Sequence, residues 1–157
     1  MLNQIYRVSF IGHRAIEHVR IVEKKIEAIV KELIKTKEFV EFFIGRNGEF
    51  DILVASIIKR VQRDYGKENS SLILVIPYSV ADMEDLEKYY DEVWYPDELY
   101  GVHFKSAITK RNERFVDHSD LLVAYVTKEF GGAFECMKKA QQKGILIAHL
   151  DDSDIDS

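Results

Sequence analysis

The sequence has one cysteine and two prolines in 157 residues, and each scarcity excludes something. A lone cysteine cannot form an internal disulfide or an all-cysteine metal site, which favours a reducing compartment. The two prolines each follow a short apolar run and interrupt no expected helix or strand. No apolar run approaches the roughly 20 residues that cross a bilayer, and the first residues do not resemble a signal peptide. The sequence therefore predicts a soluble, cytoplasmic protein with no membrane partner.

Excess positive charge is also missing. The formal net charge is −5, and much of it comes from the segment 151–157, which holds four aspartates. Without that segment, 22 basic residues face 23 acidic ones. A nearly neutral body argues against direct nucleic-acid binding of the kind that neutralises many phosphates. The acidic segment 151–157 is expected to be a disordered tail.

Apolar runs alternate with helical repeats along the chain. Between the runs, apolar residues recur at steps of three and four, as they do on one face of a helix. This alternation predicts an α/β fold: a three-layer Rossmann-like sandwich with a mostly parallel sheet of about six strands. We expect one domain over residues 1–150. The predicted strands are 5–11, 39–44, 72–76, 92–95, 121–126 and 145–150, and the predicted helices are 19–33, 50 to about 66, 83–89, 103–116 and 133–143.

Glycine is used sparingly and unevenly. Five of the eight glycines fall at three strand-to-helix junctions, namely Gly12, Gly45 with Gly48, and Gly131 with Gly132. In a parallel sheet such junctions share one edge, where the free N–H groups of helix starts favour an anion. The junctions therefore predict a pocket for a phosphate-bearing small molecule, with the last glycine pair as the phosphate cradle.

Four side chains near these junctions have two interpretations each. Arg14 can grip a phosphate with two parallel hydrogen bonds, or be a solvated turn residue. His13 can face the ligand, or bond within its own turn. Asp51 can accept a hydrogen bond from a ribose or base, or be only a favourable partner of the helix dipole. Arg111 shares a helix face with apolar residues, so it either binds the ligand or pairs with an acidic side chain across the helix layer.

No cofactor or metal is predicted. The chain contains neither G-x-G-x-x-G nor G-x-x-x-x-G-K-[ST], so the ordinary dinucleotide fingerprint and the P-loop are both missing. The five histidines are scattered, with no spacing typical of a metal site. Cys136 has no activating histidine nearby in the sequence and is expected to be a packed small residue.

Taken in order, the junction motifs resemble a known family. Their set is similar to the YpsA-like branch of the SLOG superfamily, the Rossmann-like group that joins DprA-type DNA-processing proteins with the LOG phosphoribohydrolases. The resemblance covers residues 5 to about 150. The motifs that carry it are Phe10-Ile11-Gly12-His13-Arg14, Gly48-x-Phe50-Asp51, Arg111-Asn112 followed by Val116-Asp117-x-Ser119-Asp120, and Gly131-Gly132-Ala133.

This resemblance implies a pocket for a nucleotide or nucleotide-derived ligand at the carboxyl ends of the strands. Carried over by position, Gly12, His13 and Arg14 line its first side. Gly45, Gly48 and Asp51 line the second side, Arg111 and Asn112 the third, and Gly131 with Gly132 the phosphate end.

One motif departs from the family. The LOG enzymes have P-G-G-x-G-T-x-x-E, and here Phe134 stands at the third glycine and Lys138 at the glutamate. Glu135 lies three positions earlier and faces another side of the helix. The resemblance therefore implies the ligand pocket without the phosphoribohydrolase activity.

Our first hypothesis is a protein that binds, and senses or processes, a nucleotide-derived ligand. The alternative is a hydrolase of a nucleoside phosphate or related N-glycosidic bond. In that case Arg14 or Arg111 stabilises the phosphate, and Asp51 or Glu49 assists the departing base. A ligand-free scaffold would not explain the glycines at all three junctions. The sequence leaves open whether any reaction is catalysed and whether the chain forms a homo-oligomer.

Overall fold

The computed structural model describes residues 4–150, so the predicted tail at 151–157 lies outside the described residues. Six strands form one all-parallel sheet in the order β4-β3-β2-β1-β5-β6. Five α-helices and one short 3₁₀ helix connect them. The predicted α/β fold class is confirmed. The strands are β1 (Ile5–Gly12), β2 (Phe39–Ile44), β3 (Ser70–Val75), β4 (Glu92–Trp94), β5 (Leu121–Tyr125) and β6 (Leu146–His149), and the helices are α1 (Val19–Thr36), α2 (Glu49–Tyr65), α3 (Met83–Tyr89), η1 (Asp97–Leu99), α4 (Phe104–His118) and α5 (Gly132–Lys143).

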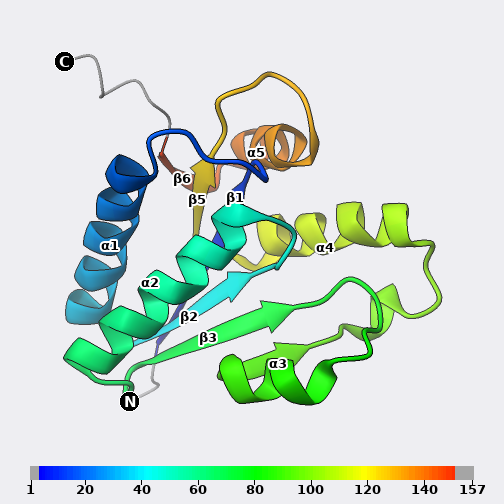
Figure 1. The fold of residues 1–157 in the computed structure, drawn as a ribbon. Coiled ribbons are helices and arrows are strands. Elements are labelled where there is room, and N and C mark those ends of the chain that lie inside the picture. The colour runs from blue at the N-terminus through cyan, green and yellow to red at the C-terminus, as the bar shows by residue number, and fades with distance from the viewer. Residues whose placement is uncertain (1–3, 151–157) are drawn as a thin grey trace.

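The two faces of the sheet are covered by different helices. On one face, α1 and α2 bury alternate strand residues such as Val8, Phe42 and Leu72 in the largest apolar cluster. On the other face, α5 packs over β5 while α4 reaches toward β1 and β2 (Figure 1). Because successive side chains along a strand point to opposite faces of the sheet, the strands contribute side chains to the apolar clusters on both faces.

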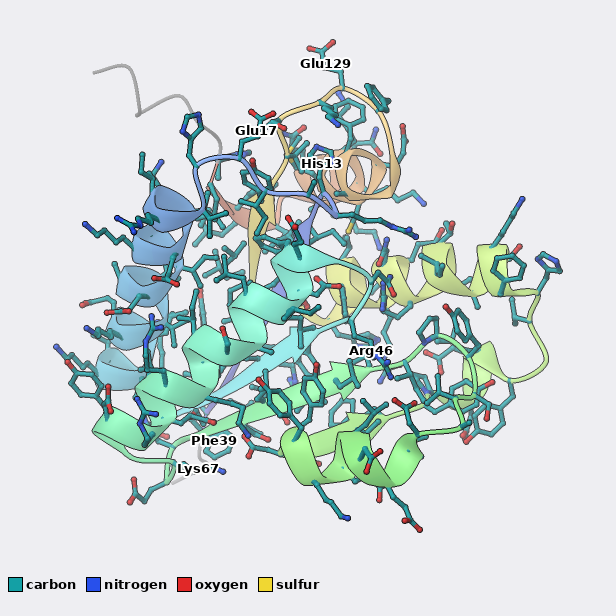
Figure 2. The ribbon with its side chains drawn as sticks, viewed as in Figure 1. His13, Glu17, Phe39, Arg46, Lys67 and Glu129 are labelled. Carbon is teal, nitrogen blue, oxygen red and sulfur yellow. The ribbon has the colours of Figure 1, made fainter. Side chains whose placement is uncertain are left out.

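Chain order places β1 at the centre of the molecule. The chain steps outward from β1 through β2 and β3 to β4, and then returns to place β5 on the other side of β1. The strands β1 and β5 are neighbours, and the chain leaves them in opposite directions, toward β2 and toward β6. Open α/β sheets leave a crevice for ligands at such a point. Figure 2 shows His13 and Arg46 at this carboxyl end of the sheet, with Phe39 and Lys67 at the opposite end.

Among residues 4–150, no helix is both long enough and apolar enough to cross a membrane.

Candidate functional site

A pocket of about 310 Å³ lies where the loops after β1, β2 and β5 meet the middle of α4. Every residue that the sequence predicted for the site lines this pocket except Gly45 and Gly48. The three junctions, far apart in the sequence, are thus brought together at one edge of the sheet. Their roles in binding stay a prediction.

The loop after β1 is fastened to the β5 side. The His13 N–H donates to the Tyr125 carbonyl at 3.2 Å, and His13 Nε2 accepts a hydrogen bond from the Lys128 backbone N–H at 3.2 Å. Burial, helped by the Lys128 charge, lowers the pKa of His13, which keeps the ring neutral and able to accept. His13 therefore joins two loops, rather than bonding within its own turn.

Arg14 is the exposed basic group at the pocket. Its carbonyl accepts from the Glu49 N–H at 2.8 Å, which ties this loop to the start of α2. Within residues 4–150 its guanidinium has no hydrogen-bond or ion-pair partner. All five N–H donors of this side chain are free for a ligand.

Arg111 lies at the floor of the pocket and is 2% exposed. Its Nη1 donates to the Val75 carbonyl at 3.2 Å, its Nε donates to Asn112 Oδ1 at 3.1 Å, and its guanidinium lies 5.2 Å from the centre of the Phe115 ring. Burial lowers the pKa of Arg111, and the Asp51 carboxylate opposes that change. Arg111 is thus held by a backbone carbonyl and the Asn112 amide, with the Asp51 carboxylate of α2 near enough to influence its charge, and no ion pair of Arg111 occurs among the described residues.

Asp51 is the acidic group on that floor. Its Oδ2 accepts a hydrogen bond from the Asn47 N–H at 2.9 Å. Burial raises the pKa of Asp51, while this hydrogen bond and Arg111 oppose the rise. Glu49, the other candidate acid, is engaged at the surface, where its Oε2 accepts from the Ile16 N–H at 3.1 Å.

The start of α5 is the open end of the pocket. Gly131 precedes the helix with a left-handed φ of 96°, and no side chain caps the helix start. A Cβ at Gly131 would have no atom within 4 Å, and one at Gly132 would meet only Asn112 Nδ2 at 3.9 Å. The backbone at the start of α5 is therefore not crowded by other atoms, which leaves room for an anion at this helix start.

Asn112 connects this helix start to α4. The Asn112 carbonyl lies 3.7 Å from the Cys136 thiol of α5, and the Asn112 side chain lines the pocket. Burial raises the pKa of Cys136 to about 11, so the thiol stays protonated at neutral pH. Cys136 is the packed small residue that the sequence predicted.

Sequence reasoning passed over the aromatic groups of this edge. Phe130, just before Gly131, is 67% exposed, and Lys128 Nζ lies 5.8 Å from the centre of its ring. Phe104 at the start of α4 is 52% exposed and lies one turn before Ile108, which lines the pocket. Only their positions next to the predicted site could have singled out these two aromatic residues, because a lone aromatic residue in a sequence usually belongs to the core. Among the described residues, no group of three or more His, Cys, Asp or Glu is placed to hold a metal ion.

The fold is that of a parallel Rossmann-like domain with a pocket at its topological switch point. No family model matches the chain, and no curated protein matches it. Among solved structures, it is similar to DNA processing protein A (DprA) from Streptococcus pneumoniae, with a TM-score of 0.66 and 15% identity over 92% of this chain. It is also similar to DprA from Helicobacter pylori, reported for its single-stranded DNA binding mode, with a TM-score of 0.63 and 14% identity over 92% of this chain. The chain spans 50% of the first DprA chain and 64% of the second.

These neighbours show that the chain has the same Rossmann-like fold as part of DprA. They contradict two of the sequence-based predictions. We expected a free nucleotide-derived ligand or a nucleoside phosphate substrate, and we took the near-neutral charge to argue against direct nucleic-acid binding. The neighbours are DNA-processing proteins, one of them described with single-stranded DNA, so they point to nucleic acid instead.

The physical reason for the error is that net charge averages over the whole surface. A bound strand contacts only one edge of a domain, and what matters there is the local supply of donors and ring faces. Here the unpaired guanidinium of Arg14 and the exposed ring of Phe130 lie at the same edge as the open start of α5.

Proposed function

We propose that this protein binds single-stranded DNA at the carboxyl edge of the sheet. The observation that carries the proposal is the combination of an uncapped helix start with free basic and aromatic side chains around it. Single-strand binding sites combine a groove that attracts the phosphate backbone with aromatic faces on which bases stack. The DprA neighbours support this choice of ligand.

A backbone phosphate fits the start of α5. The N–H groups of Gly132, Ala133 and Phe134 have no backbone acceptor among the described residues, whereas the Glu135 N–H donates to the Gly131 carbonyl at 3.0 Å, and the helix dipole favours a negative charge at this helix start. Arg14 lies across the same pocket with an unpaired guanidinium, which can hold a phosphate with two parallel hydrogen bonds. Buried Arg111 adds positive potential from below, offset in part by Asp51.

Bases then have two rings to stack on. Phe130 directly precedes the glycine pair, and Phe104 lies on α4 one turn before Ile108, which lines the pocket. Both rings are more than half exposed, at 67% and 52%. A duplex cannot use them in this way, because its bases are already stacked and paired. We therefore expect a preference for single strands.

The test is fluorescence anisotropy with a labelled oligothymidylate of about 20 nucleotides and a duplex of equal length. We expect the single strand to bind at least about tenfold more tightly. Phe130→Ala should weaken it by roughly five- to a hundredfold, since stacking of one base contributes about 1–3 kcal/mol. Arg14→Ala should weaken it by roughly tenfold, as expected for the loss of charge-assisted hydrogen bonds.

Matched controls lie at the opposite edge of the sheet. Leu146 is 63% exposed at the start of β6, and the Arg63 side chain is 73% exposed near the end of α2. Leu146→Ala and Arg63→Ala should bind DNA as the unchanged protein does. Absence of binding at 50 mM salt, or equal losses in the site and control variants, would remove the proposal.

We further propose that residues 1–150 form one domain of the YpsA-like branch, located in the cytoplasm. Support for the branch comes from the motifs of the resemblance, since His13, Arg14, Asn112 and the Gly131–Gly132 pair line one pocket.

A further inference from the structure

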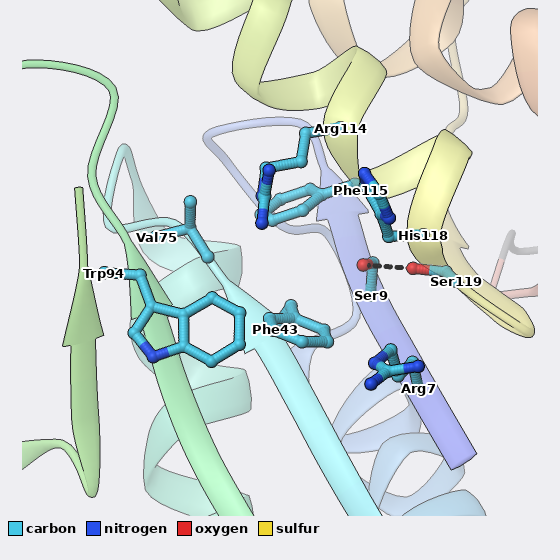
Figure 3. A pocket seen from close by; sticks show the side chains of 9 residues that line it. All are labelled: Arg7, Ser9, Phe43, Val75, Trp94, Arg114, Phe115, His118 and Ser119. Carbon is cyan, nitrogen blue, oxygen red and sulfur yellow. Dashed lines mark hydrogen bonds between the residues drawn. The ribbon is translucent and has the colours of Figure 1, made fainter. Parts of the chain in front are cut away.

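A second cavity, of about 260 Å³, lies beneath α4 on the other face of the sheet from α1 and α2. Figure 3 shows Trp94 and Phe43 on the sheet side, with Arg114, Phe115 and His118 extending from α4 opposite them. Val75 and Phe115 complete an apolar wall. The aromatic rings are close enough to form a continuous lining, because Phe43 and Trp94 have ring centres 5.2 Å apart.

Two arginines bring spare donors to this cavity. Arg7 Nε bonds to Glu41 Oε1 at 3.0 Å, and Arg114 Nη1 bonds to Glu98 Oε1 at 2.6 Å. Each guanidinium has five N–H donors, so each keeps donors that form no other hydrogen bond within residues 4–150. The two carboxylates hold the arginine side chains in place without exhausting them.

A buried hydroxyl pair supplies an independent sign of a ligand. Ser9 is fully buried on the central strand, and its Oγ lies 2.5 Å from Ser119 Oγ, with both residues lining the cavity. Two hydroxyl groups that share one hydrogen bond leave one O–H hydrogen over. In the described part of the chain that hydrogen has no acceptor, and an unmatched buried donor is costly unless something else accepts from it.

The lining of the cavity is therefore complementary to a ligand with a flat apolar body and a negatively charged hydrogen-bond acceptor. Its volume is just below the roughly 300–1,000 Å³ of pockets for drug-sized molecules, so the occupant is about the size of two fused rings. A planar carboxylate matches the fork of a guanidinium and also accepts from a hydroxyl. We propose that the cavity is a binding site for a small aromatic carboxylate, independent of the DNA site at the carboxyl edge.

Trp94 makes the proposal directly testable, because it is the chain's only tryptophan. Its indole N–H gives one resonance in a ¹H–¹⁵N spectrum of the full chain, and this resonance reports on the cavity. We would titrate 2-naphthoate and its neutral counterpart 2-naphthamide. We expect saturable shifts with naphthoate and an affinity at least about tenfold higher than that for the amide, because only the carboxylate forms charge-assisted hydrogen bonds.

The variants separate the anion site from mere hydrophobic filling. Arg114→Gln and Arg7→Gln should reduce the affinity for naphthoate toward that for the amide, and Ser9→Ala should lower it several-fold. Arg63→Gln, at an exposed position outside the cavity, is the matched control and should change nothing. Thermal unfolding would verify that each variant is folded.

Three results would overturn the proposal. Equal affinities for the acid and the amide would show that the cavity binds these ligands through apolar contacts alone and has no anion site. No saturable shift of the Trp94 resonance would mean that the cavity does not admit the ligand. A shift that depends on protein concentration without ligand would show that a second copy of the chain covers this face.

Discussion

Two kinds of glycine surround the pocket at the carboxyl edge. The packing of the protein itself requires glycine at position 45, because an added Cβ would lie 2.5 Å from Arg111 Nη1 and 3.1 Å from Asp51 Oδ2. Gly12 is crowded in the same way, 2.5 Å from the Phe50 ring. Gly132, in contrast, is uncrowded, because an added Cβ would meet only Asn112 Nδ2 at 3.9 Å. Only the last kind leaves room for a ligand.

Alanine at two of these positions should therefore have opposite effects. Gly45→Ala should destabilise the fold by about 1–3 kcal/mol, because the buried guanidinium of Arg111 must move. Gly132→Ala should leave stability unchanged or raise it by up to about 1 kcal/mol, since alanine favours a helix more than glycine does. The same methyl group enters the proposed phosphate site, so DNA affinity should fall. Urea unfolding and anisotropy measure the two effects.

A different pattern would contradict this division. If Gly132→Ala binds DNA normally, no phosphate approaches the start of α5. If Gly45→Ala is as stable as the unchanged protein, the floor of the pocket is less rigid than its contacts indicate.

At the scale of elements, hydrophobic period alone was enough to place the strands and helices. The run at 39–44 and the helical repeat at 83–89 match β2 and α3 to the residue. Strand β3 begins two residues earlier than predicted, because Ser70 and Ser71 are buried polar residues that no apolar pattern reveals. The short helix η1 was not predicted, since three residues are too few to show a period.

Strand order and the cavity beneath α4 were beyond the sequence. Every strand is largely apolar, so composition does not tell which one lies beside β1. The cavity takes its lining from four strands and one helix region, with Arg7 and Arg114 more than a hundred positions apart. The sequence showed a charged stretch at 110–120 but could not show which of its side chains would turn toward the sheet. At the carboxyl edge, by contrast, chain topology itself gathers the junctions, and the glycines mark them.

One carboxylate joins three elements at the far end of the sheet. Asp91 Oδ2 accepts from the Leu72 N–H of β3 at 2.7 Å and from the Gln62 amide of α2 at 3.0 Å, and Lys67 Nζ lies 3.0 Å from Oδ1. Burial raises the pKa of Asp91, but these three donors together lower it by more, so the net pKa is below its ordinary value. The stability it contributes is present above that ordinary pKa and is lost as the pH falls through the lowered one.

We therefore expect Asp91→Asn to cost about 1 kcal/mol at pH 7, a value kept small because the site is partly exposed. The cost should shrink toward pH 2.5, where the native carboxyl group also becomes protonated. Urea unfolding at both pH values measures this difference. Asp64→Asn is the control, because Asp64 is exposed and pairs only with its neighbour Arg63. A cost that is the same at both pH values would show that the charge of Asp91 is irrelevant.

For the whole molecule, the unusual combination is a net negative chain and the polyanionic ligand that we propose for it. The last described strand, β6, runs parallel to the others, and Leu150 bonds to the Ala124 carbonyl of β5 at 2.8 Å. The four aspartates within 151–157 follow Leu150 in the sequence. These four negative charges account for most of the formal net charge of −5, so they oppose the binding of any polyanion.

Replacing all four aspartates by asparagine should strengthen DNA binding at low salt only. Removing four negative charges weakens the overall repulsion of a polyanion, so we expect a gain in affinity of roughly two- to fivefold at 0.01 M salt. The screening length is about 30 Å at 0.01 M salt but about 8 Å at 0.15 M, so the gain should vanish near physiological salt. Anisotropy titrations of the single strand at both salt concentrations decide the point, with Glu84→Gln and Glu87→Gln on α3 as a surface-charge control. A gain that persists at 0.15 M would mean that the segment blocks the site by contact rather than by long-range repulsion.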